Sequence, residues 1–336
     1  MADNPVLVNL WRGSALESRH RGAVAVVDAA GKLVFSLGDV YRPEFPRSAI
    51  KFLQAIPLVE SGAVEQFQLE NRHIALACAS HNGETVHTEL VSSWLEKIGC
   101  SVDDLECGAE MPLDPQTQFD MMGRGEVPKR HHHNCSGKHA GLLATCRAYD
   151  EPTTDYRLYT HAAQRRWFNV LQDLTRVEVA TLGWGYDGCG IPSLALPLQR
   201  LAQALGRFAD PVGLPLERAE AIERVLEAVS AEPYMVAGRD RLCSDLMALT
   251  GREVLVKIGA EGMYIAVIPR LGLGVALKIE DGHKRAAQIA LGATLRHLGV
   301  LDDEHAEALQ DYLRPNLSNS RGDVIGYAEP SSIWKH

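Results

Sequence analysis

The sequence lacks any run of apolar residues approaching the roughly 20 that a helix needs to cross a bilayer. Its first residues, Met1 to Pro5, also lack the charged stretch and apolar segment that mark a secretory signal. We therefore expect a cytoplasmic protein with no membrane partner. The seven cysteines are odd in number and widely scattered, which is not the pattern of a disulfide framework. We expect free thiols in a reducing compartment, with some of them bound to a metal.

Basic residues are in the minority, with 34 Lys and Arg against 43 Asp and Glu, and the net charge is −9. The densest basic cluster, Lys129–His133, is short, so nucleic acid and anionic membranes are disfavoured as partners. The sequence shows no internal repeat and no low-complexity segment. Its 46% hydrophobic and 23% charged residues are ordinary for a soluble globular protein.

Strand patterns occur at both ends of the chain, and helical patterns fill the middle. Apolar, β-branched runs at Val6–Leu10 and Ala23–Leu37, the second interrupted by a turn at Asp28–Gly31, predict a β-hairpin at the start of the fold. Later strands are indicated at Val254–Ile258, Tyr264–Ile268 and Gly274–Ile279, and an amphipathic helix at Lys284–Leu298.

This order predicts an α/β fold in which a largely antiparallel sheet is flanked by helices, with a helical region beside it. We expect a single catalytic unit over residues 1–336. Its sheet is expected from residues of about 5–40 and 253–280, with a C-terminal helix over 283–299. The mainly helical region is expected over about 85–230.

Three short segments follow one another in an order that indicates a chemistry. Ser48–Lys51 has the pattern S-x-x-K, Ser80–Asn82 has S-x-N, and Lys257–Gly259 has K-x-G. This is the order found in serine hydrolases built like β-lactamases and penicillin-binding proteins. Each pattern is common alone, since S-x-x-K recurs at Ser332–Lys335 and K-x-G recurs at Lys97–Gly99. The evidence therefore lies in the order and the context.

Ser48 and Lys51 are three residues apart at a predicted helix start, so both side chains emerge on one face. A serine hydroxyl becomes a good nucleophile when a nearby base removes its proton. A lysine can do so only when burial or neighbouring cations lower the pKa of its amine. Backbone N–H groups at the helix start would hold the oxyanion. The alternative is a helix-capping Ser48 and a solvated Lys51.

The other two segments have structural alternatives as well. Ser80–Asn82 offers a hydroxyl, an imidazole and an amide after a small apolar run, or it is a turn that caps the next helix. Lys257–Gly259 ends a strand, and its glycine allows a close approach of a substrate. Lys97–Gly99 is typical of a helix end with a glycine stop. Together the three ordered segments favour a serine acyl-transfer enzyme.

Two further segments are rich in metal-binding groups: His131–His139, and a glycine-rich loop over Gly183–Pro192. Cys135 and Cys189 with a nearby nitrogen could hold Zn²⁺. A second interpretation makes Cys135 a nucleophile with His139 as its base. A third leaves both cysteines as buried free thiols.

At these segments the sequence resembles the Rhizobium etli-type L-asparaginases, and the resemblance extends over nearly the whole chain. The segments that carry it are Arg47–Lys51, Ala79–Glu84, His133–His139, Asp187–Gly190 and Lys257–Gly262. The resemblance implies a β-lactamase-like fold, a homodimer, and hydrolysis of L-asparagine to L-aspartate and ammonia. It also implies two Ser-Lys pairs.

In the implied site Ser48 is the nucleophile and Lys51 its base, while Ser80 with Lys257 relays a proton to the leaving ammonia. One Zn²⁺ per chain is expected at Cys135, Lys138 and Cys189, where it positions substrate rather than attacking it. The expected substrate contacts are Arg47, His139, Asn82 and Asp187, the last with a water molecule nearby.

Two rival functions follow from the same residues. A Ser-Lys hydrolase could act on glutamine, a β-lactam or a peptide, although the lack of an export signal argues against a cell-wall peptidase. The other rival is a non-catalytic zinc-binding protein in which the Ser-Lys pairs are structural.

Overall fold

The computed structural model describes residues 4–335, so Met1, Ala2 and Asp3, which were considered above for an export signal, lie outside it. The chain forms two compact units. Unit 1 comprises Met1–Ala49, Ala195–Asp210 and Val256–His336, and unit 2 comprises Ile50–Leu194 and Pro211–Leu255. Within residues 4–335, no helix combines the length and the apolar character that a membrane crossing requires.

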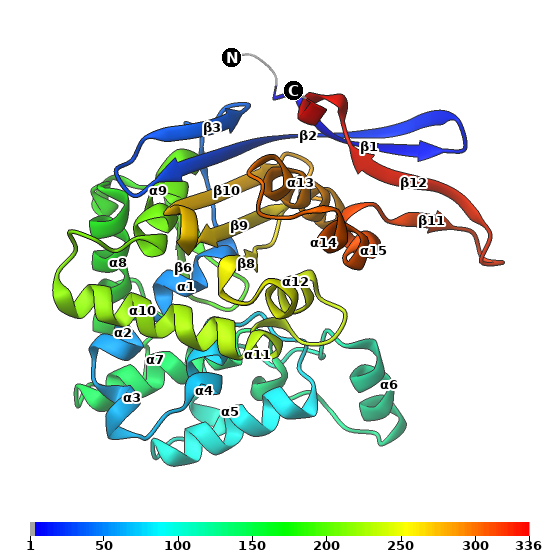
Figure 1. The fold of residues 1–336 in the computed structure, drawn as a ribbon. Coiled ribbons are helices and arrows are strands. Elements are labelled where there is room, and N and C mark those ends of the chain that lie inside the picture. The colour runs from blue at the N-terminus through cyan, green and yellow to red at the C-terminus, as the bar shows by residue number, and fades with distance from the viewer. Residues whose placement is uncertain (1–3, 336) are drawn as a thin grey trace. The chain divides into compact units, whose positions relative to one another are not determined.

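Unit 1 is built on one large sheet, whose strands run in the order β11-β12-β1-β2-β10-β9-β8, with β3 paired to β2 (Figure 1). The pairings of β1 with β2 and β12, of β2 with β3 and β10, of β9 with β10, and of β11 with β12 are antiparallel. The strands are β1 (Val6–Arg12), β2 (Ala15–Asp28), β3 (Leu33–Leu37), β8 (Leu255–Ile258), β9 (Met263–Ile268), β10 (Leu273–Ile279), β11 (Asn316–Ser318) and β12 (Val324–Pro330).

Helices α9 (Leu198–Ala209) and α13 (Lys284–His297) pack on this sheet. Helix α15 (Gln310–Leu313) contacts α13 and α14 (Asp303–Ala308). Helix α9 contacts β2, β9 and β10, and α13 contacts β1, β9, β10 and β12. Glycines allow α9 to lie directly on the strands, because a Cβ atom on Gly274 would be 2.2 Å from Ala202 O, and one on Gly206 would be 2.7 Å from Val27 O. A short ladder of β4 (Pro43–Glu44) and β7 (Leu196–Pro197) completes unit 1.

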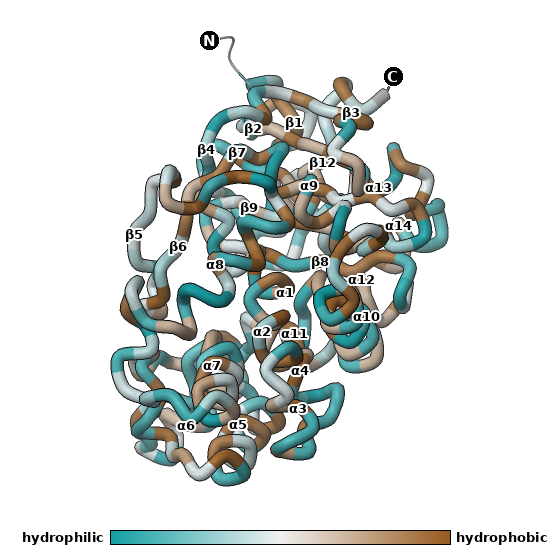
Figure 2. The backbone as a smooth tube through the Cα atoms, turned by 90° about the vertical axis from the view of Figure 1, so that its left-hand side faces the viewer, coloured by the Kyte–Doolittle hydropathy of each residue, from teal (hydrophilic) through white to brown (hydrophobic). Residues whose placement is uncertain are grey.

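Unit 2 is mainly helical. Its helices are α1 (Lys51–Gln54), α2 (Ile56–Glu60), α3 (Ala63–Gln66), α4 (Asn71–Ala77), α5 (Thr85–Lys97), α6 (Pro115–Gly123), α7 (Ser136–Ala148), α8 (Ala162–Thr175), α10 (Leu216–Ala231), α11 (Pro233–Ala237) and α12 (Leu242–Thr250). A two-stranded hairpin joins β5 (Trp184–Tyr186) to β6 (Pro192–Leu194). Hydrophilic and hydrophobic colours alternate along α10 in Figure 2, as expected for a helix with one buried face.

The packing of α7 against α4 fixes where the site residues of unit 2 lie. A Cβ atom on Gly137 would be 2.3 Å from Leu76 O, and one on Gly141 would be 3.3 Å from Ala77 Cβ. Two glycines one helical turn apart therefore let the helix backbones approach closely. This brings Cys135, which directly precedes α7, and Lys138 in its first turn close to the end of α4, after which Ser80 follows.

The structure confirms the predicted α/β class and the largely antiparallel sheet. The sheet also contains β11 and β12, which the sequence patterns did not indicate. Helical structure begins before residue 85, with α1 to α4. The organisation as a single catalytic unit remains a prediction.

Candidate active site

Lys51 is the first residue of α1, and its side chain is completely buried. Its amine donates hydrogen bonds to the carbonyl oxygen of Ala79, to Ser80 Oγ at 3.0 Å and to Cys135 Sγ at 3.0 Å. A buried amine requires such partners, because removing an unpaired ammonium group from water is very costly. The alternative of a solvated Lys51 is therefore wrong, and the lysine joins the second serine motif to the first cysteine.

The segment Ser80–Asn82 follows α4 and is held by its backbone. The Ser80 N–H donates to Val236 O at 3.0 Å, and the His81 N–H donates to Asn134 O at 3.1 Å. Helix α5 begins at Thr85 with Glu84 as its N-cap, so neither Ser80 nor Asn82 caps this helix. The segment is a fixed, irregular stretch that presents its side chains within unit 2.

The ring of His81 is completely buried and has partners at both nitrogens. Its Nδ1 accepts from the Gly83 N–H at 3.0 Å, which places the ring proton on Nε2, 2.9 Å from Ser136 Oγ. Burial and nearby cations hold the pKa of His81 well below its usual value. His81 is therefore a neutral, structural histidine rather than a base.

Asn82 is paired inside the protein through both ends of its amide. Its Nδ2 donates to Arg239 O at 2.8 Å, and its Oδ1 accepts from Arg241 at 2.6 Å. Next to it Glu84 accepts from Tyr234 Oη at 2.5 Å and from the Arg239 N–H at 3.0 Å. The substrate contact predicted for Asn82 stays a prediction.

Tyr234, Arg239 and Arg241 were missed by the sequence reasoning. They lie in and directly after the short helix α11, and no spacing pattern relates this stretch to Ser80–Asn82. The signal that the sequence offers for these residues is their neighbour Gly238, which adopts φ +102°. A Cβ atom there would be 2.3 Å from Glu84 Oε1, so the position requires glycine.

Cys135 directly precedes α7, and Cys189 lies in the turn between β5 and β6; both are buried. A hydrogen bond from Cys189, together with the cations of Lys51 and Lys138, holds the pKa of the Cys135 thiol well below its usual value. Lys138 Nζ in turn donates to Cys189 Sγ at 2.9 Å. The sulfur atoms of Cys135 and Cys189 thus lie buried beside the amines of Lys51 and Lys138.

These residues can be compared with the needs of Zn²⁺. Two sulfur atoms and the nitrogen of Lys138 meet here, and sulfur and nitrogen are the usual zinc donors. Burial alone would lower the pKa of Lys138, but Cys189, Cys135 and Asp187 raise it well above its usual value, so a metal ion must displace a proton from this amine. Throughout residues 4–335, no group of three or more His, Cys, Asp or Glu side chains is arranged to hold a metal ion. The donor set fits Zn²⁺ only when a deprotonated lysine is counted.

Asp187 is fixed in the same turn as Cys189. Its Oδ1 accepts from the Gly188 N–H at 2.7 Å, and its backbone N–H donates to Ile191 O at 2.8 Å. Gly190 closes the turn at φ +82°. Asp187 is thus placed close enough to Lys138 to raise its pKa.

Arg47 and Ser48 begin the short 3₁₀ helix η1 (Arg47–Ile50) and belong to unit 1. Arg47 has φ +52°, a left-handed conformation that costs a residue with a Cβ atom about 1 kcal/mol or more. Such conformations persist where the surroundings enforce them, and they concentrate at functional sites. Both residues are partly exposed.

Within unit 1 the K-x-G segment lies against this turn. A Cβ atom on Gly259 would be 2.5 Å from Pro46 O and 3.2 Å from the backbone nitrogen of Ala49. The Ala49 N–H already donates to Pro46 O at 3.1 Å, which leaves it unsuited to hold an oxyanion in this conformation. Lys257 is completely buried, and its amine donates to Ile258 O at 3.0 Å.

The predicted residues thus form two groups. Unit 1 holds Arg47, Ser48 and Lys257, and unit 2 holds Lys51, Ser80, Asn82, Cys135, Lys138, His139, Asp187 and Cys189. Both predicted Ser-Lys pairs combine one residue from each unit, so the pairs stay predictions. Lys51 with Ser80 is a contact that the sequence did not indicate.

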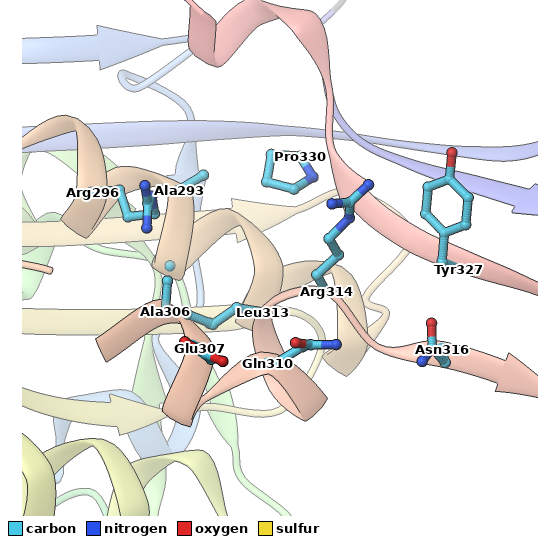
Figure 3. A pocket seen from close by; sticks show the side chains of 11 residues that line it. Ala293, Arg296, Ala306, Glu307, Gln310, Leu313, Arg314, Asn316, Tyr327 and Pro330 are labelled. Carbon is cyan, nitrogen blue, oxygen red and sulfur yellow. The ribbon is translucent and has the colours of Figure 1, made fainter. Parts of the chain in front are cut away.

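A pocket of about 540 Å³ lies elsewhere, among α13, α14, α15, β11 and β12 of unit 1 (Figure 3). Its arginines Arg296 and Arg314 are paired with Asp303 and Glu329, respectively. None of its lining residues is a predicted site residue. The chemistry indicated by the sequence is therefore not located in this pocket.

Comparison with known proteins gives a family. The model of the family described as L-asparaginase II matches residues 8–330. No match was found among curated proteins.

Solved structures similar to this chain include a β-lactamase from Mycobacterium bovis, with 15% identity and a TM-score of 0.41 over 82% of this chain and 94% of that one. A D-alanine carboxypeptidase from Burkholderia cenocepacia has 13% identity and a TM-score of 0.42 over 83% of this chain and 93% of that one. The likeness in fold is partial at these scores, and the family match covers nearly the whole sequence. The chain belongs to the L-asparaginase II family.

Proposed function

We propose that this chain is an amidohydrolase that converts L-asparagine to L-aspartate and ammonia through an acyl-enzyme on Ser48. The observation that carries this proposal is the buried Lys51 amine 3.0 Å from the Ser80 hydroxyl, on a helix that follows directly in the chain after Ser48. Membership of the L-asparaginase II family supports a hydrolase of this class.

In the proposed reaction Ser48 Oγ attacks the side-chain amide carbon of asparagine while its proton passes to Lys51. The new C–O bond gives a tetrahedral intermediate. This intermediate collapses when its C–N bond breaks and the leaving nitrogen takes up a proton, which releases ammonia. A water molecule then attacks the ester, and aspartate leaves as Ser48 recovers its proton.

The partners of Lys51 support a role in moving that proton. The carbonyl of Ala79 can only accept hydrogen bonds, whereas the hydroxyl of Ser80 can accept or donate one. The Lys51 amine donates to this carbonyl, to the Ser80 hydroxyl and to Cys135 Sγ, and the Ser80 hydroxyl can in turn donate its own hydrogen. The same contact can pass a proton onward, as the relay to the leaving ammonia requires. The role of Lys257 in this relay is proposed from the family resemblance.

Arg47 is proposed to bind the substrate carboxylate. Arg47 precedes the nucleophile by one residue and is partly exposed, and a guanidinium carries the forked donors that carboxylates prefer. Asparagine and glutamine differ by one methylene group, which a pocket distinguishes by roughly 10- to 200-fold. We propose asparagine as the preferred substrate.

We also propose one Zn²⁺ per chain, held by Cys135, Lys138 and Cys189. Bound there, the ion would supply positive charge that helps to orient the substrate. The homodimer remains a proposal from the resemblance, and analytical ultracentrifugation of the purified chain tests it.

An ammonia-release assay tests the proposed reaction. Wild type should release ammonia from asparagine, and Ser48→Ala should lose activity by several orders of magnitude. The chain contains its own control, because Ser332 begins the second S-x-x-K copy and is exposed; Ser332→Ala should retain wild-type activity. Glutamine and nitrocefin assayed in parallel would reveal a different amide substrate. Full activity in Ser48→Ala would exclude Ser48 as the nucleophile.

A further inference from the structure

His139, a predicted substrate contact, has one paired and one unpaired ring nitrogen. The side chain is completely buried in the first turn of α7, where its backbone N–H donates to Cys135 O at 3.1 Å. Its Nδ1 lies 2.7 Å from the hydroxyl of Tyr156. Its Nε2 has no hydrogen-bond partner among residues 4–335. Buried polar atoms almost always have a partner, so this nitrogen requires an explanation.

The neighbours of Tyr156 determine which nitrogen of His139 carries the proton. The hydroxyl of Tyr156 accepts a hydrogen bond from the Glu106 backbone N–H at 2.7 Å. Its own hydrogen then needs an acceptor, and His139 Nδ1 is the partner in place. If Nδ1 instead carried the proton and donated it, the phenol hydrogen would have no acceptor within residues 4–335. The arrangement that pairs every hydrogen makes Nδ1 an acceptor and places the imidazole proton on Nε2.

Tyr156 is itself held firmly. The Glu106 carboxylate accepts from the backbone N–H groups on either side of it, those of Asp155 at 2.5 Å and of Arg157 at 3.0 Å. The Tyr156 carbonyl accepts from Gln164 at 2.7 Å. A loop residue held by these hydrogen bonds can keep the histidine ring in one orientation and one tautomer.

We propose that Tyr156 is a positioning residue that keeps His139 as a neutral donor, so that its Nε2–H binds an oxygen atom of the substrate. An N–H group can bind a carboxylate or amide oxygen but not an ammonium group. This assignment rests on the proposed asparagine hydrolysis and sharpens it, because it excludes the substrate ammonium as the partner of His139. The unpaired N–H is satisfied when the substrate is bound.

The tautomer can be read without any assay of activity. In full-length protein labelled with ¹⁵N-histidine, the protonated and unprotonated ring nitrogens give well-separated NMR signals, and His139→Gln identifies those of His139. Wild type should show the proton on Nε2. Tyr156→Phe, which removes only the hydroxyl, should give a mixture of tautomers. An Nδ1-protonated ring in wild type, or an unchanged spectrum in Tyr156→Phe, would overturn the proposal whether or not the protein hydrolyses asparagine.

The substrate contact is tested by adding L-asparagine to labelled Ser48→Ala protein and by steady-state kinetics. The Nε2–H signal should shift as asparagine binds. Tyr156→Phe should raise KM roughly tenfold or more and change kcat much less. His139→Gln keeps an N–H near the position of Nε2 and should retain most of the affinity that His139→Asn loses. Tyr149→Phe, at the other end of α7, is the matched control and should leave KM unchanged.

Saturation with asparagine that leaves the Nε2–H signal unmoved would also overturn the substrate contact, since the donor would then serve a buried water. Equal losses in His139→Gln and His139→Asn would do the same. Melting temperatures of Tyr156→Phe and wild type, measured together, separate these outcomes from a general loss of folding. Absence of ammonia release by wild type would instead refute the proposed function and leave the tautomer assignment standing.

Discussion

The amine of Lys51 lies 3.0 Å from the hydroxyl of Ser80, although the sequence motif pairs this lysine with Ser48. One buried amine is thus placed to exchange a proton with a second serine. We predict that Lys51→Arg lowers kcat for asparagine by about 10³-fold or more, because a guanidinium keeps the charge but cannot act as a base. Ammonia release measured at saturating substrate checks this.

Lys97 provides the control for the lysines, because it belongs to the second K-x-G copy and ends α5 on the surface. Lys97→Met should leave kcat unchanged, whereas Lys257→Met should reduce it strongly if Lys257 belongs to the relay. Equal activity in the two variants would remove Lys257 from the mechanism.

The strained backbone at Arg47 gives a prediction that separates stability from function. Arg47→Gly should stabilise the fold by up to about 1 kcal/mol, because glycine adopts φ +52° without a steric cost. It should also raise KM for asparagine roughly 10- to 100-fold through the loss of the guanidinium. Asp150→Gly relaxes an exposed residue at φ +52° and should stabilise without changing KM. Urea unfolding measures the stability of both variants, and steady-state kinetics measure their KM. An unchanged KM in Arg47→Gly would exclude the carboxylate contact.

The close approach of Gly259 to the turn before Ser48 predicts a loss of activity from one added methyl group. In Gly259→Ala the new Cβ would be 2.5 Å from Pro46 O, so the turn must move. A displacement of about 1 Å at the nucleophile can cost on the order of 10²-fold in rate. Gly123→Ala, at the end of α6, meets nothing within 4 Å and should leave kcat unchanged. Wild-type kcat in Gly259→Ala would show that this turn does not position Ser48.

Much of the sheet could be predicted because its strands carry a local signal. The runs predicted as Val254–Ile258, Tyr264–Ile268 and Gly274–Ile279 differ from β8, β9 and β10 by one residue at most at either end. Lys97–Gly99 is a helix end with a glycine at φ +67°, as predicted. In each case the sequence signal, which is apolar spacing or a glycine, lies within a few residues of the element that it specifies.

Other features depend on contacts between distant segments, which spacing does not reveal. Strand β12 has few buried residues and joins the sheet by pairing with β1, which lies at the opposite end of the chain. The Lys51–Ser80 contact likewise joins residues that are 29 positions apart in the chain and is not indicated by any motif. Tyr156 lies in a loop, and only its hydrogen bonds to Glu106 and His139 distinguish it from an ordinary buried tyrosine.

The zinc proposal predicts a metal content that depends on the Cys135 thiolate. Protein purified without chelator should contain about one Zn²⁺ per chain by elemental analysis, and Cys135→Ser should contain none, because a serine hydroxyl is a poor zinc ligand. Cys146→Ser, in the helix that follows Cys135, is the control, since burial raises the pKa of that thiol to about 12 and keeps it protonated. Equal zinc in all three proteins, or none in wild type, would contradict the proposal.

His73 should make the stability of the fold depend on pH. Its Nδ1 accepts from the Glu70 N–H at 3.0 Å, and burial, aided by Lys97 and Arg72, lowers its pKa from 6.5 to about 4. Between these two pKa values the unfolded chain binds more protons than the folded one. The stability that neutral, buried His73 contributes is therefore fully present above pH 6.5 and is lost as the pH falls towards 4. The difference between the two pKa values corresponds to roughly 3 kcal/mol in the free energy of unfolding. His73→Gln, which can still accept from Glu70, should unfold in urea with a smaller loss of stability between pH 6.5 and 4. A slope identical to that of wild type would show that His73 is not protonated on unfolding.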